Sequence, residues 1–127
     1  MKNIIKIIIE GRLDGLNEYT LENRSNKYSG NKVKKNNERH VLTYLHKAKP
    51  LPIVTYPITV RTTWYEPNKR RDADNIVFAK KFILDTFVKY GLLKNDGQKQ
   101  INKFVDIIKV DTVNQRIEVE LYVEEKK

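Results

Sequence analysis

The stretch from Asp74 to about Tyr90 constrains the fold more than any other part of the sequence, because apolar residues cover most of its helical circumference. These residues are Ile76, Val77, Ala79, Phe82, Ile83, Leu84, Phe87 and Val88. The run has helical length and ends at Gly91, a residue typical of a helix C-cap. A helix that is apolar on nearly every side has to be buried by other elements. We therefore predict that the rest of the chain packs around a helix at residues 74–90.

Four further segments predict strands, and each has its own pattern. The first is dense in β-branched isoleucine, which favours a strand that is buried on both faces. The second alternates apolar and polar residues with period two, although Pro57 predicts that part of it lies at a sheet edge. The last two also alternate and are joined around Asn114, which predicts a hairpin. The segments are residues 3–9, 53–65, 104–110 and 117–123.

The polar region between Gly15 and about Lys49 contains scattered apolar residues at roughly helical spacing. We predict a helical region with a break near Ser29-Gly30, ended by Pro50 and Pro52. The resulting order is β-α-β-α-β-β. It predicts an α/β (α+β) fold with a small mixed sheet packed with helices, in one domain over residues 1–127.

Net charge predicts a polyanionic partner. The chain has 25 Lys and Arg against 16 Asp and Glu, a net charge of +9, and residues 96–127 are nearly neutral with 6 basic and 7 acidic groups. A concentrated positive field attracts nucleic acid, and an acidic membrane is the weaker alternative. The 127 residues contain no Cys, no apolar run long enough to cross a bilayer and no secretion-type cleavage site. We expect a cytoplasmic protein without disulfides.

The sharpest local motif is K-R-R-D-A-D-N at residues 69–75, where three cations lead into two carboxylates at the start of the predicted helix. Asp72 or Asp74 could be an ordinary helix N-cap. Alternatively, the two carboxylates form half of an oxygen cage for Mg²⁺, and the cations hold the phosphate that the metal polarises. The residues alone leave both interpretations open.

A third carboxylate, Asp96, lies in the turn Asn95-Asp96-Gly97 directly after the same helix. It could be a turn residue or a third metal ligand. Along the helix, Asp74, Lys81, Asp85 and Lys89 advance by near-whole turns and share one stripe. Lys81 could form a structural ion pair there, or it could stabilise a leaving oxygen in phosphodiester cleavage.

Three aspartates with water and phosphate oxygens suit Mg²⁺ better than Zn²⁺, which would need more nitrogen or sulfur ligands. His40 and His46 are six residues apart, which is the wrong spacing for one helix face. We interpret both as surface residues.

The stretch from Arg70 to Ile101, R-R-D-A-D-N…K-K-F-I-L-D…Y-G-L-L-K-N-D-G-Q-K-Q-I, resembles the central signature of the RusA family of Holliday junction resolvases. In that family R-R-D-x-D-N leads a helix that carries K-x-x-x-D, and an acidic turn follows. The segment G-L-N-E-Y at residues 15–19 is similar to the family's Asn-containing loop near the DNA. The strand order also agrees with the family's α/β fold.

The resemblance implies a homodimer that binds four-way DNA junctions and nicks them in pairs with Mg²⁺, with Mn²⁺ as a possible substitute and no small-molecule cofactor. It implies a role in DNA recombination and repair and a phage or prophage setting. Asp72, Asp74 and Asp96 would hold the metal. Lys81 would be the active lysine, although three extra residues separate it here from the D-x-D-N. An insertion near one helical turn returns Lys81 to the same helix face, whereas Lys80 lies about 100° away. The expected DNA-contacting residues are Asn17, Lys32, Lys34, Lys35, Lys69, Arg70 and Arg71.

Two other functions fit the same residues. One is a nucleic-acid-binding module without catalysis, in which the aspartates are caps and ion-pair partners. The other is a nuclease that acts on flaps, forks or plain duplex.

Overall fold

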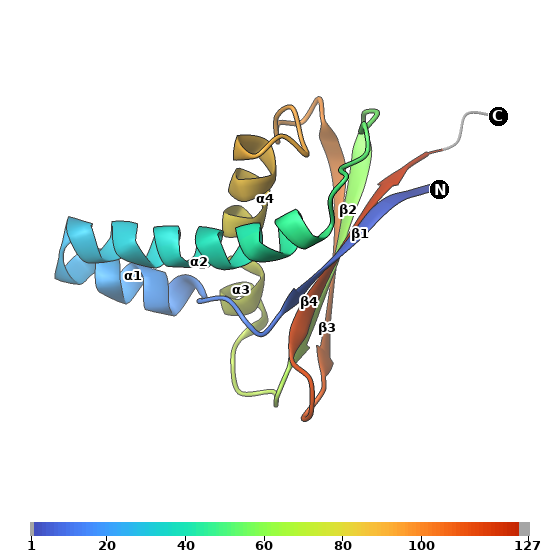
Figure 1. Ribbon diagram of the computed structural model, residues 1–127. Coiled ribbons are helices and arrows are strands. Elements are labelled where there is room, and N and C mark those ends of the chain that lie inside the picture. Colours follow the sequence, from blue (N-terminus) through green and yellow to red (C-terminus); the bar gives the residue numbers. More distant parts are fainter. Residues whose placement is uncertain (1, 125–127) are drawn as a thin grey trace.

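The computed structural model describes residues 2–124, and its four helices all lie on one side of a four-stranded sheet (Figure 1). The predicted α/β (α+β) class, with a small mixed sheet packed with helices, is confirmed. Each predicted helical region consists of two helices. In chain order the elements are β1 (Lys2–Glu10), α1 (Leu16–Ser25), α2 (Lys27–Lys47), β2 (Ile58–Glu66), α3 (Ala73–Val77), α4 (Lys80–Lys89), β3 (Ile101–Val110) and β4 (Arg116–Val123).

The strand order is β1-β4-β2-β3, so the predicted hairpin around Asn114 is wrong. Helices α3 and α4 form the crossover connection from β2 to β3, and β3 pairs in parallel with β2 at the edge of the sheet. The chain then passes the end of β2, where the Asp111 amide donates to the Glu66 carbonyl at 2.8 Å. Strand β4 enters between β2 and β1 and is antiparallel to both. A short connection therefore joins two strands that are not neighbours.

Three smaller predictions also need correction. Strand β1 is covered on one face only, because Ile7 and Ile9 are buried whereas Ile8 is 43% exposed. Strand β2 lies inside the sheet, between β4 and β3, and is not an edge strand. It begins at Ile58, directly after Pro57, so the lack of an N–H group on the proline costs the strand no backbone hydrogen bond. The predicted helix at residues 74–90 is interrupted at residues 78 and 79.

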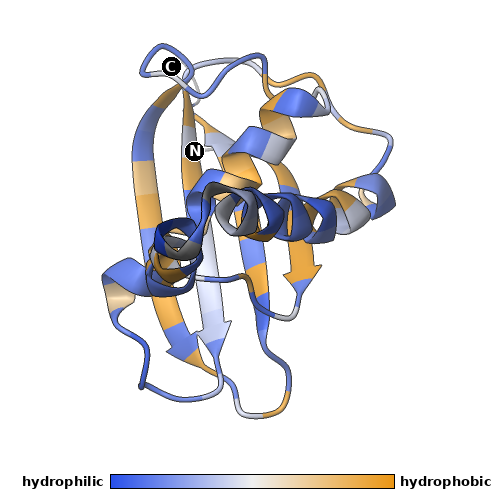
Figure 2. Cartoon of the chain, turned by 90° about the vertical axis from the view of Figure 1, so that its left-hand side faces the viewer, coloured by the Kyte–Doolittle hydropathy of each residue, from blue (hydrophilic) through white to orange (hydrophobic). Residues whose placement is uncertain are grey.

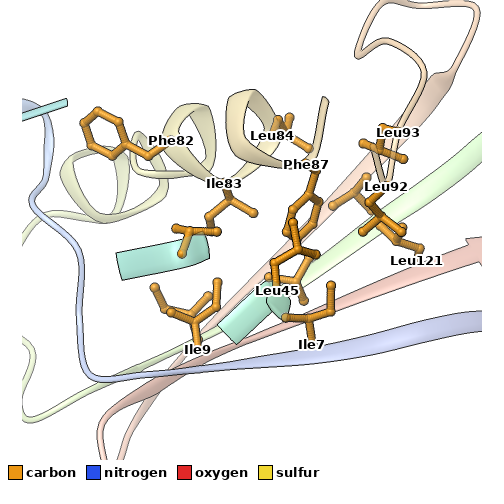
Figure 3. Close-up of a cluster of buried hydrophobic side chains, with 14 of the residues drawn as sticks. Ile7, Ile9, Leu45, Phe82, Ile83, Leu84, Phe87, Leu92, Leu93 and Leu121 are labelled. Carbon is orange, nitrogen blue, oxygen red and sulfur yellow. The ribbon is translucent and has the colours of Figure 1, made fainter. Parts of the chain in front are cut away.

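Helix α4 is buried on most of its circumference, as its sequence predicts. Its residues Ile83 and Phe87 are at most 1% exposed and point toward Leu45 of α2 and toward Ile7 and Ile9 of β1 (Figure 3). Helix α2 thus lies between α4 and the edge of the sheet. Burial of side chains of this size contributes roughly 1.5–3 kcal/mol each, which makes this layer the main apolar support of the fold.

Helices α1 and α2 form a hairpin that projects from the sheet (Figure 1). The break between them is at Asn26, whose side chain accepts the Ser29 amide at 2.7 Å, close to the predicted Ser29-Gly30. Figure 2 shows that this hairpin is largely hydrophilic on its outer surface. No helix within residues 2–124 combines the length and the apolar character needed to cross a membrane.

The face of the sheet without helices carries an ion-pair network over β1 and β4. Lys6 and Arg116 each lie 2.8 Å from a carboxylate oxygen of Glu118, and Arg116 also lies 3.0 Å from Asp111. Burial acts to raise the pKa of Glu118, but the hydrogen bonds from Lys6 and Arg116 outweigh it and lower that pKa. The amides of Asn114 and Val113, followed by Arg116, lower the pKa of Asp111. This part of the open face is therefore occupied by paired charges.

Replacement of Gly91 by alanine should destabilise the protein by about 1 kcal/mol, because Gly91 ends α4 with φ +91°. The Leu92 amide donates to Phe87 O and the Gly91 amide to Val88 O, the pattern of a Schellman motif. The Cβ that alanine adds would have no atom within 4 Å, so the backbone angle alone should cause the loss. Urea unfolding measures it. Gly91→Asn should lose less, since Asn tolerates the left-handed region better, and an equal loss in both variants would contradict this account.

Candidate active site

The segment between β2 and α3 is anchored on Glu66, a carboxylate with only 5% side-chain exposure at the end of the central strand. Arg71 Nη1 lies 3.3 Å from Glu66 Oε1, and Arg12 Nη1 lies 3.2 Å from the same oxygen. A buried carboxylate is stable only when paired and hydrogen-bonded. Arg71 therefore points into the protein, although the sequence predicted that it contacts DNA.

A second set of contacts ties the same segment to the start of α1. Arg71 Nη2 donates to the Leu13 carbonyl at 3.3 Å. Gly15 is the N-cap residue of α1 and has no side chain that could accept a capping hydrogen bond. Instead, Oδ1 of Asn75, a residue of α3, accepts a hydrogen bond from the Asn17 amide at 2.7 Å and so caps α1. Both ends of the motif R-D-A-D-N are thus fixed to the body of the protein.

Asp72 and Asp74 lie between these two anchors, and both are exposed. Asp72 occupies the N-cap position of α3, but its side chain makes no capping hydrogen bond. Asp74 Oδ1 accepts the amide of Asn75 at 2.9 Å, which leaves its other oxygen without such a contact. Lys69 and Arg70 are exposed directly before them. The structure therefore presents a pair of carboxylates beside two solvent-facing cations.

Asp96 lies in the connection between the C-terminal end of α4 and β3. It lines a surface hollow with Lys34, Asp85 and Lys89. The C-terminal half of α4 lines this hollow, whereas the D-x-D segment precedes the N-terminus of that helix, whose ten residues span about 15 Å. Within residues 2–124, no three His, Cys, Asp or Glu side chains are close enough together to hold a metal ion. A single chain does not bring Asp96 to Asp72 and Asp74.

The two adjacent lysines of α4 have different surroundings. The Lys81 side chain is 52% exposed, and its ammonium nitrogen lies 3.8 Å from Asp85, the i,i+4 partner that helical periodicity predicts. The break at residues 78 and 79 separates Lys81 from Asp74. Lys80 is 15% exposed and donates to Asp106 Oδ2. Lys81 is therefore the lysine with a solvent-accessible ammonium group.

Asp106 is a further polar centre on the helix side of β3. Its Oδ1 accepts Trp64 Nε1–H at 3.0 Å, and its Oδ2 accepts the Lys80 ammonium group. That ammonium group also lies 4.2 Å from the centroid of the Phe104 ring. The charge of Asp106 is thus paired with Lys80 at the surface of β3.

The other residues predicted to contact DNA lie on the projecting hairpin. Lys32 and Lys35 are exposed on α2, whereas Lys34 is half-buried with its ammonium nitrogen 3.9 Å from Asp85. Asn17 is exposed at the start of α1. His40 is half-buried, with Nε2 2.6 Å from the Glu10 carbonyl, which corrects its interpretation as a surface residue.

Sequence reasoning missed Glu66, Gly15 and Asn75 as the residues that hold this segment. A signal for Glu66 was present, because a period of two that runs through Val60 and Trp64 places residue 66 on the buried face of β2. Nothing local marks the pairing of Gly15 with Asn75, which are 60 positions apart. Comparison of the chain with protein-family models and with curated proteins found no match to either.

Replacement of Gly15 by alanine should destabilise the protein by roughly 1–3 kcal/mol. A Cβ there would lie 2.5 Å from Asn75 O and Oδ1 and 2.6 Å from Arg71 Nη2, so the anchored segment has to shift. Urea unfolding monitored by circular dichroism measures the loss. Gly97→Ala is the matched control, since its nearest neighbour would be Gln100 Oε1 at 3.4 Å. Equal stability changes in the two variants would show that the close approach is unimportant.

Proposed function

We propose that this protein is a Mg²⁺-dependent, structure-selective endodeoxyribonuclease that resolves four-way DNA junctions by paired nicking, in DNA recombination and repair. One observation carries the proposal. Asp72 and Asp74 are exposed, as are Lys69 and Arg70 shortly before them in the chain, on a segment fixed at both ends. Fixed carboxylates next to free cations can hold a metal and a phosphate group at the same place.

The donor set fits Mg²⁺, which proteins often bind through one or two carboxylates while water and phosphate oxygens complete the shell. Asp72 and Asp74 would hold the ion, and Mn²⁺ would fit the same oxygens. When bound, the ion would supply Lewis-acid activation of the phosphodiester. Lys69 and Arg70 would bind the phosphate, and the exposed Lys81 is the proposed lysine that neutralises developing charge.

The proposed third ligand, Asp96, follows the C-terminal end of α4 in the same chain, whereas Asp72 and Asp74 precede that helix. Its participation needs a second copy, which agrees with the proposed homodimer. A twofold dimer also suits a four-way junction, because resolution needs two matched cuts.

The projecting hairpin is the proposed contact with the junction arms. Lys32, Lys34 and Lys35 on α2 and Asn17 on α1 would contact phosphate and sugar, which positions the protein without reading base sequence. The net charge of +9 supports a polyanionic partner of this kind.

A DNA-binding module without catalysis is the second candidate. One observation favours it: within residues 2–124 of one chain, no three candidate ligands are placed to hold a metal ion together. In that case Asp72 and Asp74 would be unimportant for DNA function. A nuclease with a different branched substrate is the remaining alternative, and the choice of DNA in the assay separates it.

Asp74→Asn should reduce junction cutting by about 100-fold or more while DNA binding is kept, because the variant removes a proposed metal ligand but no cation. The assay incubates the protein with a labelled four-way junction or a linear duplex of the same sequence, with Mg²⁺ or with chelator. Glu10→Gln, an exposed acid on β1, is the control for the loss of one negative charge. Binding without any cutting by the unaltered protein would support the second candidate, and equal cutting of both DNAs would exclude junction selectivity.

A further inference from the structure

Strand β1 lies at an edge of the sheet, and part of its backbone faces away from β4. The Gly11 amide, at the end of β1, donates to the carbonyl of Gln115, which directly precedes β4, at 2.9 Å. In an antiparallel pair, residues whose N–H and C=O bond to the neighbouring strand alternate with residues whose groups point away from it. Counting back by two from Gly11, the odd-numbered residues bond to β4 and the even-numbered ones face outward. The outward-facing residues are Lys6, Ile8 and Glu10.

Both ends of this edge are closed, which makes its free segment short. At the C-terminal end, His40 of α2 lies with Nε2 2.6 Å from the Glu10 carbonyl and covers that acceptor. At the N-terminal end, the register of β1 against β4 shifts between Asn3 and Ile5, and such an irregularity disrupts regular pairing. The free edge therefore runs from residue 6 to the amide of residue 10.

The lysine of this free edge does not guard it. Proteins commonly protect an edge strand with charged side chains, lysine above all. The ammonium nitrogen of Lys6 lies 2.8 Å from Glu118, which holds it over the open face of the sheet toward β4. The next outward-facing residue is Ile8, which is apolar and 43% exposed. The middle of the edge is therefore open to another strand.

A surface groove runs beside this edge, and the C-terminal part of α2 forms its other wall. Residues 6–8 and 10 of β1 line one side, and Tyr44, Lys47 and Ala48 line the other. Tyr44 is half-buried, and the exposed Lys47 has its ammonium nitrogen 4.9 Å from the centroid of that ring. In the part of the chain that the structure describes, this ammonium group forms no ion pair with a carboxylate. The groove thus combines free backbone groups, an aromatic wall and an unbalanced positive charge.

We propose that this groove binds an extended, acidic segment of another protein, which adds to the sheet as a strand beside β1. In strand addition, main-chain hydrogen bonds provide affinity, and alternate side chains provide specificity. Tyr44 and Lys47 are three residues apart on α2, which places their Cβ atoms about 5–6 Å apart. Alternate residues of a strand are about 6.7 Å apart and point to the same face. We therefore expect an apolar and an acidic residue two positions apart in the bound segment.

Two other occupants match the groove less completely. A second copy of the chain would bring its own α2 beside its own β1, so the helix walls of both copies would enter the same space. Nucleic acid would balance the charge of Lys47, but it has no amide and carbonyl groups with the spacing of a strand. A segment without a helix at its edge satisfies both features.

Selection from a displayed library of random 12-residue peptides tests the groove with the full chain. The Ile8→Pro variant serves as counter-target, because proline at this position removes an outward-facing N–H and no bond to β4. Peptides that survive should carry the apolar-x-acidic pattern. A synthesised survivor should bind Ile8→Pro at least about tenfold more weakly than the unaltered protein in fluorescence polarisation. Ile8→Thr keeps the N–H and a β-branched side chain, so it should bind like the unaltered protein.

Charge reversal on α2 is a second test that leaves the strand unchanged. Lys47→Glu should weaken binding of the same peptide about tenfold or more, and added salt should weaken binding to the unaltered protein. Lys99→Glu, at an exposed turn position before β3, makes the same charge change away from the groove and should have little effect. Circular dichroism checks that each variant is folded.

Three results would overturn the proposal. The first is that no peptide survives the counter-selection, or that the survivors bind Lys47→Glu as tightly as the unaltered protein. The second is a dimer of the unaltered protein that dissociates in Ile8→Pro during sedimentation, which would assign the edge to a second copy. The third is a loss of DNA binding in folded Ile8→Pro, which would assign the groove to nucleic acid.

Discussion

The buried carboxylate of Glu66 is the constraint on which the rest of the candidate site depends. A charge in that position costs several kcal/mol unless cations and hydrogen bonds balance it. Arg12 comes from the segment after β1, and Arg71 comes from the segment after β2, so both are drawn to the end of the central strand. The two arginines of the R-R-D motif consequently have opposite orientations. Arg70 faces solvent and Arg71 faces the protein.

The same anchor determines where the helical hairpin begins. Gly15 approaches Asn75 so closely that only a residue without a side chain fits, and Asn75 caps α1 in return. Tyr19 then stacks on Phe78 with ring centroids 5.6 Å apart, which packs α1 against the break between α3 and α4. The proposed DNA-contacting hairpin and the exposed aspartates are thus held by one set of contacts. A change in this region would affect both features together.

Local patterns predicted the elements of this fold well, and long-range pairing much less well. The apolar run at 74–90 predicted burial of α4 because that property depends on composition around one helix. The hairpin prediction at Asn114 was wrong, because a turn signal predicts that the chain reverses but not which strands pair. Strand β4 pairs with β1 and β2 instead of with β3. Among site residues, Asp72 and Asp74 are exposed at the start of α3, and their role as metal ligands stays a prediction. The inward orientation of Arg71 was missed, because the period-two pattern indicates the burial of Glu66 but nothing local shows that Arg71 is a cation that pairs with it.

Charge repulsion has to be offset wherever the three aspartates meet. Two carboxylates about 4 Å apart repel by roughly 4 kcal/mol at an effective dielectric near 20. In one chain Asp96 lies in a hollow with Lys34 and Lys89 and with two further carboxylates, Glu38 and Asp85. In the proposed dimer the partner's Asp96 would join Asp72 and Asp74, and a divalent cation would have to offset the added repulsion. Metal binding and formation of the proposed homodimer would then favour each other, because a ligand that binds only the assembled form stabilises that form. The proposed metal site and the proposed homodimer are therefore coupled by electrostatics.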